Sequence, residues 1–238
     1  MLGRMNTSLS SLGLALAFLG ALGWALFDVA RKQLAQRVPP AALTLWLTLA
    51  QLPLLCAWSA STGPVLLPRA SLLPMAFSVL LNLGGLLAFM QALRLSPMSL
   101  TIPLLSCTPV GTTLIGWALR HQVPTSPQMA GVALVVAGAF TLGLRSGQWP
   151  GLGAYLRDPG VRRMAIAALL WSLTAVIDQV ALQLGAGYWY ALALTAGVGL
   201  LLGAILLLGG QGKDLWEAGG LLFRRPTLLV AAALLGSL

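Results

Sequence analysis

The charged residues of this chain stand at the borders of long uncharged stretches. Between Arg4 and Asp28 lie 23 uncharged residues. The interval from Arg69 to Arg94 holds 24, and the next, which ends at Arg120, holds 25. A helix needs roughly 20 apolar residues to cross the hydrocarbon core of a bilayer. A soluble domain could not bury so many segments of this length, so the pattern predicts a polytopic membrane protein.

The apolar runs are continuous, which favours helices over the alternating strands of a membrane barrel. The predicted fold class is therefore all-α, with seven spans and the start of an eighth. The seven spans are Leu12–Leu34, Ala41–Trp58, Leu72–Leu93, Leu100–Leu119, Gln128–Leu144, Met164–Leu184 and Tyr188–Leu208. From Thr227 to Leu238 there is room for only about 18 Å of helix. Either this last segment lies at the membrane interface or the sequence stops inside its eighth span, and we favour the second interpretation.

Composition agrees with a membrane location and favours lipid over nucleic acid as the partner of the basic residues. The chain is 58% hydrophobic and 8% charged, far below the roughly 25% charged that is typical of soluble domains. The net charge of +9 could indicate nucleic acid, but the sequence has no basic domain outside the membrane. Lys and Arg in short loops are expected to face lipid headgroups instead.

The first 27 residues resemble a signal peptide, since Arg4 precedes an apolar stretch. That stretch is longer than a usual signal core and further spans follow it, so it is predicted to be the first helix. Cys56 and Cys107 fall in separate spans and indicate no disulfide framework.

Two connections are longer than the others. Residues 145–163 are rich in Gly and Pro and are predicted to be a linker loop. It would separate a first repeat of five helices, residues 1–144, from a second, truncated repeat, residues 164–238. The connection from Gly209 to Pro226 mixes apolar and charged residues and is expected at the membrane interface.

An internal repeat supports the division into two halves. When Trp24 is set beside Trp171, the polar pair Arg31 and Lys32 falls beside Asp178 and Gln179. Five spans separate the two copies, so the second would cross the membrane in the opposite sense. Inverted repeats recur in transporters, with the substrate site at the repeat interface.

Ionisable groups inside spans are the strongest site candidates. Asp28, Arg31 and Lys32 share one side of the first helix near its end, and Asp178 lies deeper in its own helix. Buried charges of this kind usually face a cavity, a partner or a proton path. For the first three, snorkelling and an Asp28–Lys32 ion pair remain an alternative. Asp178 is the candidate for proton or cation coupling, and Arg31 and Lys32 are candidates for holding an anionic group.

Further candidates for substrate contact are Trp24, Trp171, Gln179 and Asn82, although a polar group between packed helices more often makes an interhelical hydrogen bond. Pro103 and Pro109 kink the fourth span and are either tolerated there or form a hinge.

Several short motifs of the chain resemble those of a known family. Ala92-Leu93-Arg94, Ser96, Ser99 and the run Leu104–Pro109 are similar to the third-to-fourth helix signature of EamA-type permeases in the drug/metabolite transporter superfamily. The spacing of Trp24 and Lys32, and Gln128 with Gly131 and Gly138, are similar as well.

The resemblance implies ten helices in two inverted five-helix halves, and export or exchange of small metabolites or drugs. The chain departs from it at His121 and Gln122, where many members carry a Gly-Glu pair. Orientation is left open. The loops after the odd-numbered helices hold 11 of the 14 Lys and Arg, which places the N-terminus outside, whereas the resemblance favours a cytoplasmic N-terminus.

The predicted function is therefore a gradient-driven secondary transporter of small molecules in a cell membrane, with a bacterial inner membrane expected. The alternatives are a non-transporting assembly subunit or an inactive truncated permease. The Walker A pattern is absent: Asp214 follows Gly212-Lys213. The sequence also lacks the nucleophile–base pair or metal cluster that an enzyme would need. No cofactor is expected, and a homodimer remains open.

Overall fold

In the computed structural model, the structure describes residues 7–63, 67–121, 123–145 and 152–223. Every element in these ranges is a helix and none is a strand, which confirms the all-α class. The helices are α1 (Thr7–Ala35), α2 (Pro40–Thr62), α3 (Arg69–Leu95), α4 (Met98–Leu105), α5 (Thr108–Arg120), α6 (Ser126–Arg145), α7 (Leu152–Arg157), α8 (Pro159–Gln183), α9 (Trp189–Leu208) and α10 (Gly212–Phe223). The expected start of an eighth span at Thr227 lies outside the described residues.

Five helical stretches in the described ranges are long and apolar enough to cross a membrane. They are Pro40–Thr62, Arg69–Leu95, Met98–Arg120, Pro159–Gln183 and Trp189–Leu208. Each overlaps one of the predicted spans. The two remaining predictions coincide with α1 and α6, which are 29 and 20 residues long.

The predicted fourth span is broken in two. α4 ends at Leu105 and α5 begins at Thr108. A proline has no N–H, so Pro109 cannot donate the helical hydrogen bond to the carbonyl four residues earlier. At the break the Ser106 hydroxyl donates to the Pro103 carbonyl at 2.5 Å. The two prolines singled out in the sequence therefore flank a real interruption of the helix.

The predicted linker is partly helical. It contains α7, and α8 begins in it at Pro159, ahead of the expected Met164. The Asp158 carboxylate accepts a hydrogen bond from the Val161 N–H at 2.9 Å, which satisfies a helix N-terminus. Proline is also favourable in the first turn, where its missing N–H is not needed.

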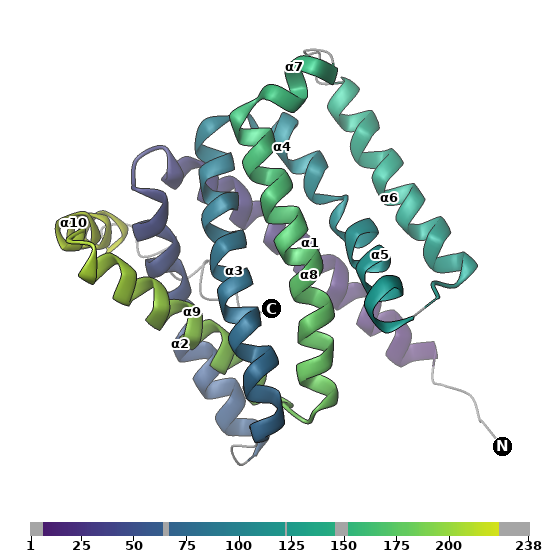
Figure 1. The fold of residues 1–238 in the computed structure, drawn as a ribbon, viewed down its shortest axis with the longest axis horizontal. Helices are drawn as coiled ribbons and strands as arrows, with labels where there is room; N and C mark the ends of the chain where they lie inside the picture. Colours follow the sequence, from purple (N-terminus) through teal and green to yellow (C-terminus); the bar gives the residue numbers. More distant parts are fainter. Residues whose placement is uncertain (1–6, 64–66, 122, 146–151, 224–238) are drawn as a thin grey trace.

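The centre of the bundle is formed by α3 and α8, which lie side by side (Figure 1). α2 and α9 pack on one side of this pair, and α4, α5 and α6 lie on the other. α1 crosses behind the pair and contacts α3.

Polar contacts join three helix termini at one end of the bundle. The Lys32 ammonium group, near the end of α1, donates to the carbonyl oxygens of Leu93 and, at 2.7 Å, of Ser96, at the end of α3. The Ser96 hydroxyl donates to Asp158, directly before α8, at 2.6 Å. α8 therefore starts where α1 and α3 end, and runs antiparallel to both.

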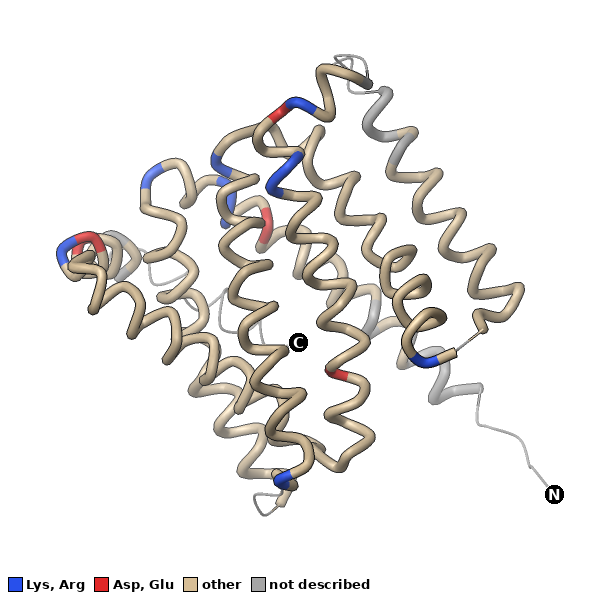
Figure 2. The backbone as a smooth tube through the Cα atoms, viewed as in Figure 1, with Lys and Arg blue, Asp and Glu red and all other residues tan. Residues whose placement is uncertain are grey.

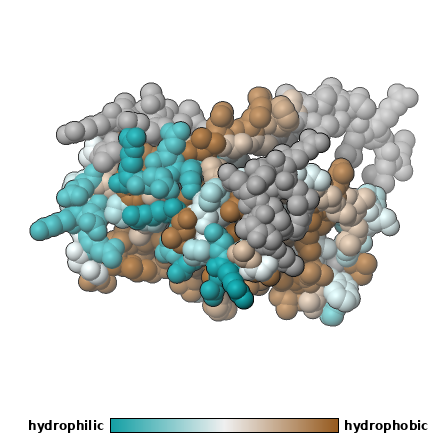
Figure 3. Space-filling view, turned by 90° about the horizontal axis from the view of Figure 1, so that it is seen from above, coloured by the Kyte–Doolittle hydropathy of each residue, from teal (hydrophilic) through white to brown (hydrophobic). Residues whose placement is uncertain are grey.

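Most of the Lys and Arg residues also lie at this end (Figure 2). Figure 3 looks onto it and shows hydrophilic side chains gathered between hydrophobic ones. The bundle thus has one strongly basic polar end, as short loops at a lipid headgroup layer would require.

Candidate functional site

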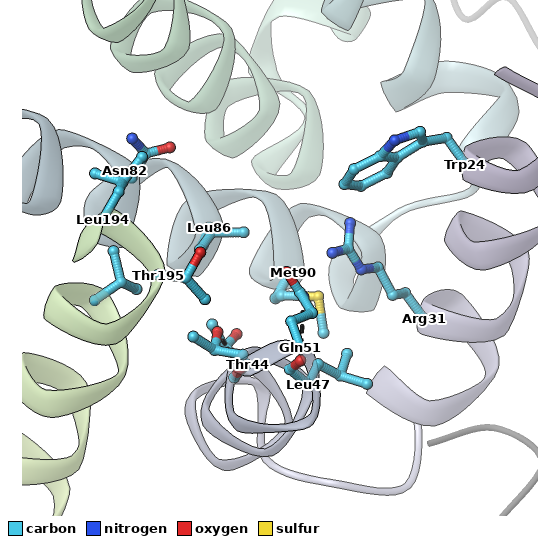
Figure 4. A pocket seen from close by; sticks show the side chains of 12 residues that line it. Trp24, Arg31, Thr44, Leu47, Gln51, Asn82, Leu86, Met90, Leu194 and Thr195 are labelled. Carbon is cyan, nitrogen blue, oxygen red and sulfur yellow. Dashed lines mark hydrogen bonds between the residues drawn. The ribbon is translucent and has the colours of Figure 1, made fainter. Parts of the chain in front are cut away.

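Two adjoining cavities lie inside the helix bundle. One, of about 150 Å³, is lined by α1, α2, α3 and α9. The other, of about 310 Å³, is lined by α1, α3, α4 and α8, and both are partly open. Both are lined by the same four residues, Trp24, Arg31, Asn82 and Leu86. Figure 4 shows Trp24 and Arg31 at one end of the first cavity, and Asn82 and Thr195 at the other.

Arg31 is a buried cation surrounded by aromatic rings. Its exposed fraction is 6%, and its guanidinium carbon lies 4.0 Å from the ring centre of Phe27, 5.3 Å from that of Trp24 and 5.8 Å from that of Phe89. Ring faces attract a cation, and more strongly where water is excluded.

The polar contacts of Arg31 are few. One terminal nitrogen, Nη1, forms an ion pair with the Asp28 carboxylate at 3.3 Å. The Nε atom is buried and has no hydrogen-bond partner. An unsatisfied buried donor is costly, so a bound acceptor group would relieve that cost.

The two tryptophans that the internal repeat pairs line the same cavity. Trp171 packs against Phe89 with 5.4 Å between ring centres, and Trp24 packs against Phe27 at 6.0 Å. Trp24, Phe89 and Trp171 give the 310 Å³ cavity an aromatic wall on the α1, α3 and α8 sides.

The α2 wall carries polar residues that sequence reasoning missed. Thr44, Thr48 and Gln51 line the smaller cavity. Their spacing places them on one face of the helix, and this face was the signal available in the sequence. It is inconspicuous because each is a small or neutral polar residue within a long apolar run.

Lys32 does not line either cavity. Its ammonium group donates to carbonyl oxygens at the C-terminus of α3, and the Gln36 amide donates to the carbonyl oxygen of Arg94 there at 3.2 Å. Cations are favourable at a helix C-terminus. The structure thus separates the two neighbouring cations: Arg31 faces the cavities, and Lys32 holds two helices together.

Asp178 also lies outside the two cavities. Its Oδ1 atom accepts hydrogen bonds from the hydroxyl groups of Ser78 on α3 and Tyr190 on α9. Ser78 is one helical turn before Asn82, whose amide nitrogen donates to the Ser78 carbonyl at 3.1 Å. The carboxylate is therefore next to the Asn82 end of the cavities.

The remaining candidates are elsewhere. Gln179 is exposed and lines a separate groove with Pro109 of α5 and Gln128 of α6. Pro103 lies inside α4. Within the described residues, no group of three His, Cys, Asp or Glu side chains could hold a metal ion.

Comparison with known proteins gives the family. The model of the EamA-like transporter family matches residues 11–144, more than half of the chain. A relative in Klebsiella pneumoniae (strain 342), named "Probable 4-amino-4-deoxy-L-arabinose-phosphoundecaprenol flippase subunit ArnE", is 38% identical over 65 residues. The match covers 27% of this chain and 58% of the relative, so the chain matches just over half of that protein's length. No solved structure matches the chain. The chain is a multi-pass membrane protein that belongs to the EamA-like transporter family, a family of transporters and not of enzymes.

Proposed function

We propose that this chain is a secondary transporter that moves a small organic molecule through the two cavities, by export or exchange driven by a gradient. The observation that carries the proposal is the buried Arg31, which faces both cavities and has a partner for only part of its guanidinium group. A membrane helix rarely retains such a charge unless a ligand or a pathway uses it.

The ion coupling would run through Asp178. Its carboxylate is held by hydroxyl groups of α3 and α9 and lies close to the Asn82 end of the cavities. A proton or cation bound there would change the field at that end. We expect Asp178→Asn to abolish gradient-driven flux, and unchanged flux would remove Asp178 from this role.

The pairing of helices from the two halves of the chain supports a transport role. α1 and α8 run in opposite directions and place Trp24 and Trp171 on the same cavity. The end of α2 meets the start of α9, where the Ser59 hydroxyl donates to the Tyr188 carbonyl at 3.4 Å. These two pairs, α1 with α8 and α2 with α9, are what two five-helix repeats of opposite orientation would produce, with the site at their interface.

The second candidate is a non-transporting subunit of a membrane assembly. Its support is the similarity to the Klebsiella protein, which is named as a subunit of a flippase for a lipid-linked sugar. In that case the cavities would complete a site only together with another chain.

Access to the cavities distinguishes the two candidates. We would replace Cys56 and Cys107, the two native cysteines, by serine and introduce Asn82→Cys as a reporter. A transporter should expose this cysteine to a membrane-impermeant maleimide from each side of sealed vesicles in turn. Labelling from one side alone would contradict transport and favour the subunit. Leu83→Cys, one residue away and 6% exposed, is the control and should stay unlabelled from both sides.

A further inference from the structure

We propose that the ligand of the two cavities is a zwitterion, with its anionic group at Arg31 and a primary ammonium group at the oxygen atoms near Asn82. This inference rests on the cavity of the proposed function and names the chemical class of its ligand.

The anionic end is defined by Arg31. Among the described residues that line the two cavities, Arg31 alone is basic. Its Nη1 is taken by Asp28, but the buried Nε has no partner. Guanidinium donors bind carboxylate and phosphate groups in planar pairs. The surrounding rings of Phe27, Trp24 and Phe89 keep the site apolar, which strengthens a charge-assisted bond.

The opposite wall offers acceptors. The hydroxyl groups of Thr44 and Thr48 donate at 2.8 Å to the carbonyl oxygens of Pro40 and Thr44, respectively. A hydroxyl group has one proton, so both can only accept from a ligand. The amide nitrogens of Gln51 and Asn82 each donate to a carbonyl of their own helix at 3.1 Å, and their amide oxygens take no part in those bonds. An ammonium group, with three donors, suits such a wall.

The charge of Asp178 favours a cation over a neutral donor at this end. Ser78 and Tyr190 hold its carboxylate, and each lies one helical turn before a lining residue, Asn82 and Leu194. The negative charge therefore stands about one helical turn beyond Asn82 and Leu194. A ligand hydroxyl group would form the same hydrogen bonds but would gain none of this attraction.

The distance between the two ends limits the ligand. On α3, Phe89, whose ring faces Arg31, follows Asn82 by seven positions, or roughly 10 Å of helix. Figure 4 shows Arg31 and Asn82 at opposite ends of the cavity. With about 3 Å for each hydrogen bond, the two charges of the ligand are several ångströms apart. The linear probe 6-aminohexanoate has this character.

The test compares four probes that differ by one group: 6-aminohexanoate, hexanoate, hexylamine and 6-hydroxyhexanoate. Binding is measured by isothermal titration to the full chain in lipid nanodiscs. We expect 6-aminohexanoate to bind at least tenfold more tightly than each of the other three. Equal binding of hexanoate or 6-hydroxyhexanoate, or no binding of 6-aminohexanoate, would overturn the proposal.

Variants assign the two ends. Asn82→Leu removes one of the acceptors and should weaken the binding of 6-aminohexanoate while leaving the binding of hexanoate unchanged. Arg31→Gln should weaken the binding of all three carboxylates at least tenfold and leave the binding of hexylamine unchanged. Gln179→Leu, in the separate groove, is the control and should change nothing. If Asn82→Leu weakens all four probes equally, the ammonium assignment is wrong.

The outcomes also separate this inference from the proposed function. Tight binding of 6-aminohexanoate with labelling of Asn82→Cys from one side only would support the zwitterion site and contradict transport. Labelling from both sides without such binding would overturn the zwitterion site alone.

Discussion

The Trp171 indole ring lies directly against Gly85, where α8 crosses α3. A Cβ atom added at Gly85 would stand 2.6 Å from the Trp171 Nε1 atom, a separation too short for any real contact. The same ring forms part of the wall of the larger cavity. The shape of that wall therefore depends on the absence of a side chain at Gly85.

We predict that Gly85→Ala displaces Trp171 and lowers the free energy of unfolding by about 1–3 kcal/mol, the usual cost of overpacking. Thermal unfolding in detergent and the accessibility of an Asn82→Cys reporter would measure the two effects. Gly138→Ala is the matched control, because nothing lies within 4 Å of a Cβ atom there. Equal melting temperatures for the two variants would show that the α3–α8 contact is looser than the structure indicates.

Because Arg31 and Asp28 form an ion pair at 3.3 Å, we predict that substitutions at the two positions have coupled effects on stability. Arg31→Met leaves the Asp28 carboxylate partly buried without its cation, which is more costly than removing both charges. The double variant Asp28→Asn with Arg31→Met should therefore be more stable than Arg31→Met alone. We expect a coupling of about 0.5–3 kcal/mol in a double-mutant cycle of thermal stability. Additive effects would mean that Asp28 is not the counter-ion of Arg31.

We predict that removing the hydroxyl group of Tyr190 lowers the stability of the fold. Tyr190 is 6% exposed and donates to the Asp178 carboxylate. Tyr190→Phe removes this bond, and a hydrogen bond to a charged group contributes about 1.5–3 kcal/mol.

The neighbouring Tyr188 is 65% exposed and gives the control, since Tyr188→Phe should change the stability by less than about 0.5 kcal/mol. Unfolding midpoints of the two variants, measured side by side in the same detergent, would check the difference. If the two substitutions cost the same, the Tyr190–Asp178 contact contributes nothing to the fold.

The sequence predicted the helices because their signal is local. Charges at the borders of apolar runs located every described span, and the prolines marked the break between α4 and α5. The predicted start of α8 at Met164 is too late, because the glycine and proline residues in 145–163 favour a loop. In fact Asp158 and Pro159 form the first turn of a capped helix.

The site was less accessible from sequence because its residues come together only through packing. The sequence indicates Asp28 and Arg31 because they are charges within a predicted span. It indicates Trp24 and Trp171 because the internal repeat pairs them. That Lys32 turns away from its neighbour Arg31 depends on the end of α3, 61 residues further along the chain. The acceptor character of the α2 wall also depends on the structure, because it arises only where the hydroxyl protons of Thr44 and Thr48 are already donated to backbone carbonyls.

The last prediction concerns the junction of helix ends. Asp158 caps α8 through the Val161 N–H at 2.9 Å and accepts from the Ser96 hydroxyl at 2.6 Å. Asp158→Ala removes both bonds and should lower the stability by about 0.5–2 kcal/mol, as for other N-caps. Asp158→Asn should retain most of the cap, because an amide oxygen can accept from the same N–H. Asp214→Ala, at an exposed position in α10, serves as the control in the same thermal unfolding assay. If Asp158→Ala is no worse than Asp214→Ala, α8 begins without help from its cap, and the contact with α3 alone fixes that end of the bundle.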